Sequence, residues 1–292
     1  MPPPGPCATA STAATSAAHT RAVPTSPDVS SRQNPRYKAA LGLRAVRERR
    51  RRGLLLVDGA REIGRALDSG ASLAEAWVAP ERIRSQAAGA LLARLAGAGE
   101  IIETTPELLA RLAYGERDEG VVAVFETPAT DLGALELPAR PLVAVVEGVE
   151  KPGNLGASLR SADGAGVDAV IVADPISDVW NPNAIRASLG TIFSTRLAVA
   201  PSAEALAYLR RHSIAVYAAR VEGSIAWDAV DLTAPAALVV GAETSGLSEV
   251  WRGEDVAAVR IPMLGLADSL NVSATAAVLF YEARRQRRVE DR

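Results

Sequence analysis

Cysteine and histidine are scarce in this chain of 292 residues, and their scarcity removes several classes of function. The single cysteine, Cys7, cannot form a disulfide within the chain, so we expect a reducing, intracellular compartment. The only histidines are His19 and His212, and one cysteine with two separated histidines cannot build a Cys/His zinc site. A Ser-His-Asp site would have to use His212, whose neighbouring residues predict an ordinary helix, so such a site is disfavoured.

Long apolar runs are also missing. No run reaches the roughly 18 residues of a membrane-spanning helix, and the N-terminus lacks the basic-then-apolar order of a signal peptide. We therefore expect a cytoplasmic protein. The formal net charge is -2, so the charge of the whole chain does not indicate a nucleic-acid partner, and any such case depends on local charge.

The chain divides by composition into a tail and two larger units. Residues 1–35 are rich in Pro, Ala, Ser and Thr and hold almost no large apolar residues, which predicts a disordered tail. Residues 36–127 alternate short apolar runs with helical patterns and predict a small α/β domain. Residues 128–140 contain Pro138 and read as a linker.

Residues 141–292 predict a second α/β domain with a parallel sheet. Its first strand is the continuous apolar run 142–146, as expected for a strand covered on both faces. Helical and strand patterns then alternate to the closing helix, 272–285. The further strands are expected at 168–172, 196–199, 214–218 and 236–240.

Basic residues gather at the start of the first domain. Residues 36–61 hold nine Arg or Lys against two acids, in a chain with a slight acidic excess. A face that binds RNA phosphates explains this cluster, and a solvated helix end is the alternative. The candidate RNA-binding residues are Lys38, Arg44, Arg47, Arg49, Arg50, Arg51 and Arg52.

Three loops of the second domain carry unusual residues. Ligands of parallel sheets bind outside the carboxyl ends of the strands, and each loop is expected near that edge. The first contains Asn154, Gly156 and Arg160, the second reads Gly-x-Glu-x-x-Gly over 241–246, and the third is the apolar segment 261–273. Taken singly, each could be an ordinary turn or a helix cap.

Taken together and in this order, the three loops resemble the SpoU/TrmH branch of the SPOUT methyltransferases. The motifs are Asn154-x-Gly156-x-x-x-Arg160, Gly241-x-Glu243-x-x-Gly246-Leu247, and Ile261-Pro262-Met263 followed by Ser269-Leu270-Asn271-Val272-Ser273. The likeness runs from about residue 142 to 288. The preceding segment, with Leu56-Val57-Asp58-Gly59 near its start, resembles more weakly the small L30e-like substrate-binding domain of the family.

The resemblance implies a fold, a methyl donor and an assembly. The C-terminal segment should form a deep trefoil knot, one of the rare exceptions to unknotted topology. S-adenosylmethionine should bind in the knot without any metal, against Gly241, Ile261, Met263 and Leu270. The enzyme should be a homodimer whose site is completed across the interface.

The resemblance also implies roles for polar residues. Arg160 matches the catalytic arginine of the family, and Asn154, Glu243, Ser269 and Asn271 should orient it, the reacting hydroxyl and the donor. Because an arginine is a poor base at its usual pKa above about 12, positioning of a phosphate and stabilisation of charge are the easier roles for Arg160.

The expected activity is therefore transfer of a methyl group to a ribose 2′-hydroxyl of RNA. The extra N-terminal domain favours 23S ribosomal RNA over tRNA by analogy with family members. The alternatives are a tRNA 2′-O-methyltransferase, a methyltransferase acting on bases, and an RNA-binding protein that lost catalysis. A nicotinamide-dependent enzyme is disfavoured because the chain lacks the G-x-G-x-x-G fingerprint.

Overall fold

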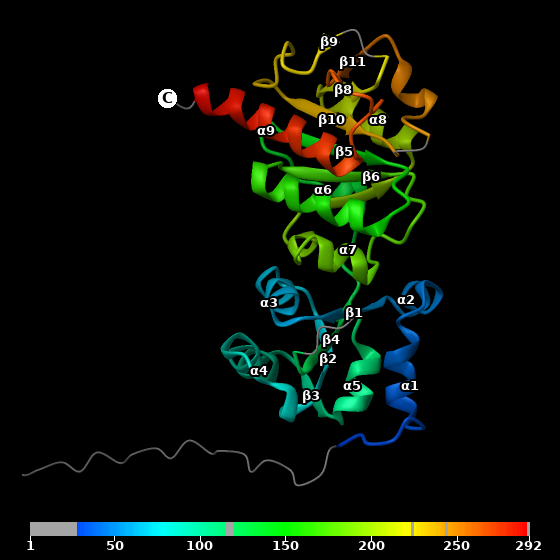
Figure 1. Ribbon diagram of the computed structural model, residues 1–292, viewed down its shortest axis with the longest axis vertical. Coiled ribbons are helices and arrows are strands. Elements are labelled where there is room, and N and C mark those ends of the chain that lie inside the picture. The colour runs from blue at the N-terminus through cyan, green and yellow to red at the C-terminus, as the bar shows by residue number, and fades with distance from the viewer. Residues whose placement is uncertain (1–27, 115–118, 223–224, 243–244, 291–292) are drawn as a thin grey trace, which may run out of the picture.

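The computed structural model describes residues 28–114, 119–222, 225–242 and 245–290. In this part of the chain, two α/β units are stacked end to end, with the N-terminal unit below the C-terminal unit in Figure 1. The expectation of two α/β units is confirmed. None of the helices in the described ranges is long and apolar enough to cross a membrane.

The N-terminal unit is built on a four-stranded sheet of order β1-β4-β2-β3. Strand β4 runs antiparallel to both neighbours, whereas β2 and β3 are parallel. The strands are β1 (Leu54–Asp58), β2 (Leu73–Val78), β3 (Glu100–Glu103) and β4 (Val121–Glu126). The helices are α1 (Pro35–Gly42), α2 (Val46–Arg52), α3 (Ala60–Asp68), α4 (Gln86–Ala98) and α5 (Pro106–Leu112).

The folded chain reaches further back than residue 36. The backbone N–H of Val29 donates to the carbonyl of Glu103 (3.0 Å), and the hydroxyl of Thr104 donates to the carbonyl of Val29 (2.8 Å). Asn34 caps α1 by accepting from the N–H of Arg36 (2.8 Å). Residues 28–35, which the composition assigned to the tail, therefore belong to the N-terminal unit. Residues 1–27 lie outside the described residues.

The C-terminal unit is built on a seven-stranded, all-parallel sheet of order β7-β6-β5-β10-β8-β11-β9. The strands are β5 (Leu142–Glu147), β6 (Ala169–Ala173), β7 (Leu197–Ala200), β8 (Ala215–Ala219), β9 (Ile225–Ala226), β10 (Ala236–Val240) and β11 (Val256–Arg260). The helices are α6 (Pro152–Ala165), α7 (Pro182–Ala187), α8 (Ser202–Arg211) and α9 (Val272–Glu290). The parallel sheet is confirmed; the trefoil knot stays a prediction.

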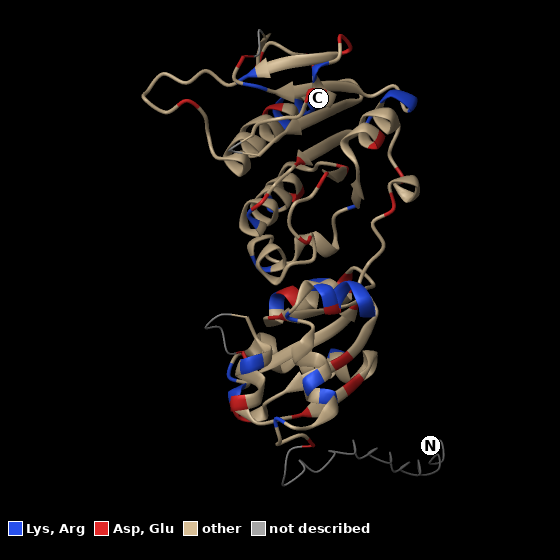
Figure 2. Cartoon of the chain, turned by 90° about the vertical axis from the view of Figure 1, so that its right-hand side faces the viewer, with Lys and Arg blue, Asp and Glu red and all other residues tan. Residues whose placement is uncertain are grey.

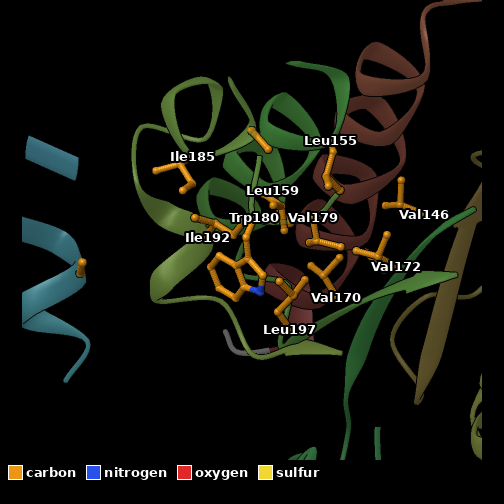
Figure 3. Close-up of a cluster of buried hydrophobic side chains, with 14 of the residues drawn as sticks. Val146, Leu155, Leu159, Val170, Val172, Val179, Trp180, Ile185, Ile192 and Leu197 are labelled. Atoms are coloured by element: carbon orange, nitrogen blue, oxygen red, sulfur yellow. The ribbon is translucent and has the colours of Figure 1, made fainter. Parts of the chain in front are cut away.

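Helices cover the central strands on both faces, as the apolar runs predict. Helices α6 and α9 pack together on one face, and α8 packs on the other. Figure 3 shows the core under α6, where Leu155 and Leu159 point toward Val146 of β5 and Val172 of β6, with Trp180 beside them. This packing fixes α6, the helix that carries the first sequence motif, against the sheet.

The two units share one apolar core cluster. The rings of Phe125 in β4 and Phe193 in the C-terminal unit lie 6.2 Å apart between centroids. Polar contacts flank the rings, because Arg65 of α3 donates to the carbonyl of Leu189 (2.9 Å) and Arg186 of α7 donates to the carbonyl of Tyr114. The N-terminal unit is therefore packed against the C-terminal unit.

The predicted linker also packs against the C-terminal unit. The N–H of Val199 donates to the carbonyl of Thr130 (2.9 Å), and the hydroxyl of Tyr208 donates to the carbonyl of Leu135 (3.2 Å). The partly buried side chain of Leu135 contacts the core under α8. The segment that joins the two units is therefore held against the C-terminal unit by hydrogen bonds and by apolar contact.

Candidate active site

A cavity of about 710 Å³ opens at the carboxyl edge of the parallel sheet. Strands β10, β8 and β11 are adjacent there, so the loops that follow them form its walls. This is the position in which open parallel sheets bind ligands. All four residues expected to bind the donor line the cavity, together with Ser269: Gly241, Ile261, Met263, Leu270 and Ser269.

The loop after β10 needs both of its glycines. A Cβ atom on Gly241 would lie 2.6 Å from the carbonyl oxygen of Gly246, closer than any real contact, so the loop can fold back only over a glycine. Gly246 has φ +65°, in the left-handed region that favours glycine, and its N–H donates to the carbonyl of Ala242 (2.9 Å). Glu243, the acid expected in this loop, lies outside the described residues.

A buried carboxylate holds the end of this loop. Glu147, at the end of β5, is 4% exposed and accepts hydrogen bonds from the N–H (2.8 Å) and the hydroxyl (2.7 Å) of Ser248. It also accepts from the indole N–H of Trp251 (2.8 Å) and from the hydroxyl of Ser202. The sequence motifs do not include Glu147. An acid at the end of a fully apolar strand was the available signal, since a buried carboxylate requires donors around it.

The first and third motifs meet at the N-terminal end of α9. The side-chain amide of Asn271 donates to the side-chain oxygen of Asn154 in α6 over 3.4 Å. The side-chain oxygen of Asn271 accepts from the N–H of Ser273 (3.0 Å), so the alternative reading of Asn271 as a helix cap is confirmed. The same residue therefore caps α9 and links it to the start of α6.

Gly156 has a packing role. A Cβ atom on it would lie 2.4 Å from the carbonyl oxygen of Ala184 and 2.6 Å from the Cβ of Ala187, both in α7. Only a glycine permits this close contact between α6 and α7. Because α6 carries Asn154 and Arg160, Gly156 sets the depth at which these two residues sit.

Arg160 lies outside the cavity of its own chain. It is exposed on α6, and in the described part of the chain its side chain makes no hydrogen bond or ion pair. Six residues of α-helix turn the chain by about 240°, so Arg160 and Asn154 project from different faces of α6. The structure brings together Asn154 and Asn271, and separately the five cavity residues, but it does not bring Arg160 to either group.

Arg49 is a structural residue, which corrects its assignment to the RNA-binding run. Its side chain is 5% exposed and forms an ion pair with Asp178, with Nε 2.8 Å from the carboxylate. Its remaining N–H groups donate to the carbonyls of Leu43 (2.9 Å) and Arg44 (3.0 Å). With its donors turned inward, Arg49 joins the two units and is not available to a phosphate.

Other members of the run use part of their hydrogen-bonding capacity inside the protein. Arg44 donates to the carbonyl of Ala113 (2.8 Å) and lies 4.4 Å from the ring centroid of Tyr114. Arg52 donates to the carbonyl of Ala39 (2.5 Å), and Lys38 donates to Gln33 (2.5 Å). Each therefore has a structural contact.

Arg47, Arg50 and Arg51 are the exposed cations of α2. Arg51 pairs with Glu48 over 2.6 Å at the surface, whereas Arg47 and Arg50 make no side-chain hydrogen bond or ion pair with the described residues. Figure 2 shows the blue colour of Lys and Arg concentrated on the helix at the top of the N-terminal unit, beside the C-terminal unit. This positive charge therefore lies on the N-terminal unit close to its junction with the C-terminal unit.

Comparison with known proteins agrees with the motifs. The profile of the SpoU rRNA methylase family matches residues 141–281. A 23S rRNA (uridine(2479)-2′-O)-methyltransferase of Streptomyces viridochromogenes is 36% identical over 260 residues, which cover 86% of this chain and 88% of the relative. The chain belongs to the SpoU rRNA methylase family.

A second family profile matches the N-terminal unit, and solved structures superpose on most of this SpoU chain. The profile of an MRM3-like substrate binding domain matches residues 34–123. The SpoU methyltransferase AviRb from Streptomyces viridochromogenes, solved in complex with AdoMet, superposes with a TM-score of 0.81 at 34% identity, covering 87% of this chain and 98% of the other. A solved RNA 2′-O ribose methyltransferase superposes with a TM-score of 0.78 at 37% identity, covering 89% of this chain and 98% of the other.

Sequence reasoning missed part of the SpoU cavity wall. Arg220 and Glu222 follow β8, and Arg252 lies in a 3₁₀ turn before β11; all three line the cavity. For Arg220 the signal was position, because a residue that directly follows a buried parallel strand faces the ligand edge. Within residues 28–114, 119–222, 225–242 and 245–290, no three His, Cys, Asp or Glu side chains form a group that could hold a metal ion.

Proposed function

We propose that this protein transfers the methyl group of S-adenosylmethionine to a ribose 2′-hydroxyl of 23S ribosomal RNA in the cytoplasm. The observation that carries the proposal is the cavity at the carboxyl edge of the sheet, lined by Gly241, Ile261, Met263 and Leu270. A cavity of this volume whose wall combines apolar and charged side chains suits a donor that carries both an aromatic base and charged groups. The relative from Streptomyces viridochromogenes named above is a 23S rRNA (uridine(2479)-2′-O)-methyltransferase, and AviRb was solved with AdoMet.

In this reaction the S–CH₃ bond of the sulfonium donor would break as the ribose oxygen forms the new C–O bond. The donor would leave as the neutral thioether S-adenosylhomocysteine, and the hydroxyl proton would pass to solvent water. The protein's part is alignment of the oxygen with the methyl carbon and sulfur, which accounts for a large share of the rate in such reactions. Asn154 and Asn271 form the polar pair beside the cavity and would orient the hydroxyl. Arg160 would bind the adjacent phosphate and stabilise the charge that develops.

Arg160 can take this role if a second copy of the chain completes the site. Its exposure on α6, away from its own cavity, supports a homodimer in which Arg160 serves the cavity of the partner. Leu264 (97% exposed) and Leu266 (103% exposed) in the third motif loop also favour such burial. Two fully exposed leucines in one short loop are typical of a surface that contacts another chain.

The RNA would be held by the exposed cations of α2. Arg47, Arg50 and Arg51 would contact phosphates, with Lys38, Arg44 and Arg52 at the border of the same surface. Such contacts fix the orientation of the RNA without reading its sequence. The shared core of the two units would then hold the bound RNA at a fixed distance from the cavity.

The reaction is tested by transfer of labelled methyl from S-adenosylmethionine to ribosomal RNA, free and in assembled subunits, and separately to tRNA. Label recovered in a nuclease-resistant dinucleotide of 23S rRNA is the expected result, because 2′-O-methylation blocks the nucleophile that ribonucleases use. Label only in tRNA would replace the proposed substrate. Label in a base would contradict ribose methylation, and RNA binding without any transfer would favour the non-catalytic alternative.

The shared site is tested by mixing two inactive variants. Arg160→Ala should abolish transfer and leave donor binding intact, whereas Met263→Trp should fill the cavity without replacing a glycine that the loop requires. If each site combines the cavity of one chain with Arg160 of the other, equal mixing should restore about a quarter of the wild-type activity, since half the dimers are mixed and each has one complete site. A mixture that stays inactive, or a monomer in sedimentation, would refute the shared site.

A further inference from the structure

Arg220 occupies a wall of the cavity that no sequence motif covers. It directly follows β8, between the loops that begin at Gly241 and Ile261. Its backbone N–H donates to the carbonyl of Val259 in β11 (2.9 Å), so the backbone position is fixed by the sheet. The side chain is partly buried and lines the cavity.

The guanidinium of Arg220 has no partner in the described part of the protein. Its Nε atom is closed off from solvent and makes no hydrogen bond. The neighbouring acid Glu222 is engaged elsewhere, because it pairs with Arg252 over 2.9 Å, and Arg252 also contacts Glu249 (3.1 Å). A buried N–H donor without an acceptor is costly, which indicates that a ligand in the cavity supplies the acceptor.

We propose that Arg220 binds the α-carboxylate of the methionine part of S-adenosylmethionine and so selects for the amino-acid end of the donor. The inference rests on the proposed use of that donor. The adenine and ribose are uncharged, and the sulfonium and ammonium groups are cationic, so the carboxylate is the only anionic group that the donor brings. A planar guanidinium pairs with a carboxylate through two parallel N–H···O bonds.

The charges of the cavity wall agree with this assignment. Among the described lining residues, Arg252 is neutralised by Glu222, which leaves Arg220, Arg260 and Asp268. Arg260 and Asp268 are both exposed to solvent, whereas the Nε of Arg220 is not. Because a hydrogen bond to a charged group is stronger away from water, Arg220 is the member of this set best placed to discriminate a carboxylate.

The test compares two ligands in calorimetry with the full chain. One is S-adenosylmethionine, and the other is its decarboxylated analogue, which lacks only the carboxylate. The wild type should bind S-adenosylmethionine roughly 10- to 100-fold more tightly, the range expected for a hydrogen-bonded charge pair. Arg220→Met should lose that preference while binding the analogue as the wild type does, which also shows that the variant is folded.

Two further variants sharpen the result. Arg260→Met removes the same charge from the same cavity and should keep the preference for the carboxylate. Arg220→Lys keeps the charge without the planar fork and should keep part of the preference. The proposal is overturned if Arg220→Met weakens both ligands equally, if it weakens only RNA binding, or if the preference disappears in Arg260→Met. If the wild-type protein binds neither ligand, S-adenosylmethionine is not its donor, and both the proposed function and this inference are refuted.

Discussion

The same substitution at two adjacent arginines of α2 should change two different quantities: the free energy of unfolding at Arg49 and the affinity for RNA at Arg50. Arg49 is 5% exposed and donates to a carboxylate and two carbonyls, whereas Arg50 is exposed and makes no side-chain hydrogen bond or ion pair with the described residues. Arg49→Gln leaves the Asp178 carboxylate, 12% exposed, without its cation. Breaking a buried pair in this way costs about 3 to 5 kcal/mol of unfolding free energy.

Arg50→Gln should leave the unfolding free energy within about 0.5 kcal/mol of the wild type, as is usual for an exposed position. Its effect should be on RNA. Loss of one phosphate contact weakens binding across sequences and lowers the slope of log affinity against log salt by about 1. Arg49→Gln should leave this slope unchanged under conditions in which the variant is folded.

Denaturant unfolding gives the first quantity, and RNA binding at a series of salt concentrations gives the second. Asp178→Asn and the double variant complete a cycle, and their destabilisations should not add, because both remove one interaction. Equal stability of the Arg49 and Arg50 variants would refute the assignment of Arg49 as a structural residue. A lower salt slope for folded Arg49→Gln would return it to the RNA-binding surface.

Three more substitutions test two contacts beside the site and one buried acid of the N-terminal unit. Gly156→Ala should cost about 1 to 3 kcal/mol in denaturant unfolding, because its Cβ would lie 2.4 Å from a carbonyl oxygen of α7; an unchanged midpoint would contradict the close contact. Glu147→Gln should cost about 2 kcal/mol and weaken donor binding in calorimetry, since an amide N–H₂ would face donors that now meet a carboxylate oxygen; unchanged donor affinity would separate Glu147 from the loop. Burial raises the pKa of Asp58, so its protonated form is favoured in the folded state and its contribution to stability falls as pH rises through the folded pKa. Asp58→Asn should therefore gain stability relative to the wild type on going from acidic to neutral pH, and a difference independent of pH would show that the pKa is not raised.

The elements that the sequence predicted well are those with continuous apolar runs. Strands β5 and β10 are buried at every position, so their composition alone identifies them. Strand β11, Val-Ala-Ala-Val-Arg, is short and rich in alanine, and its pairing with β8 and β9 makes it a strand. Helix α2 was hidden because its seven residues include five arginines, which carry charge but no apolar periodicity.

The residues of the site also divide into those that the sequence could predict and those that depend on contacts with distant parts of the chain. The cavity residues Gly241 and Ile261 could be placed because they belong to motifs with fixed spacing. Arg49 and Arg50 cannot be distinguished in sequence, because what buries Arg49 is Asp178, 129 residues away. Arg220 was not predicted for a related reason, since a residue that ends a strand gains meaning only once its neighbours in the sheet are known.

The apolar contact between the two units, made by Phe125 and Phe193, limits how this enzyme could be re-engineered. A chimaera joined within residues 128–140 would take Phe125 from one parent and Phe193 from the other, so two rings that pack at 6.2 Å would come from unrelated surfaces. The ion pair between Arg49 and Asp178 would be split between the same two parents. A graft that aims to redirect the methyl transfer to another RNA would therefore have to transfer the residues on both sides of this contact along with the N-terminal unit.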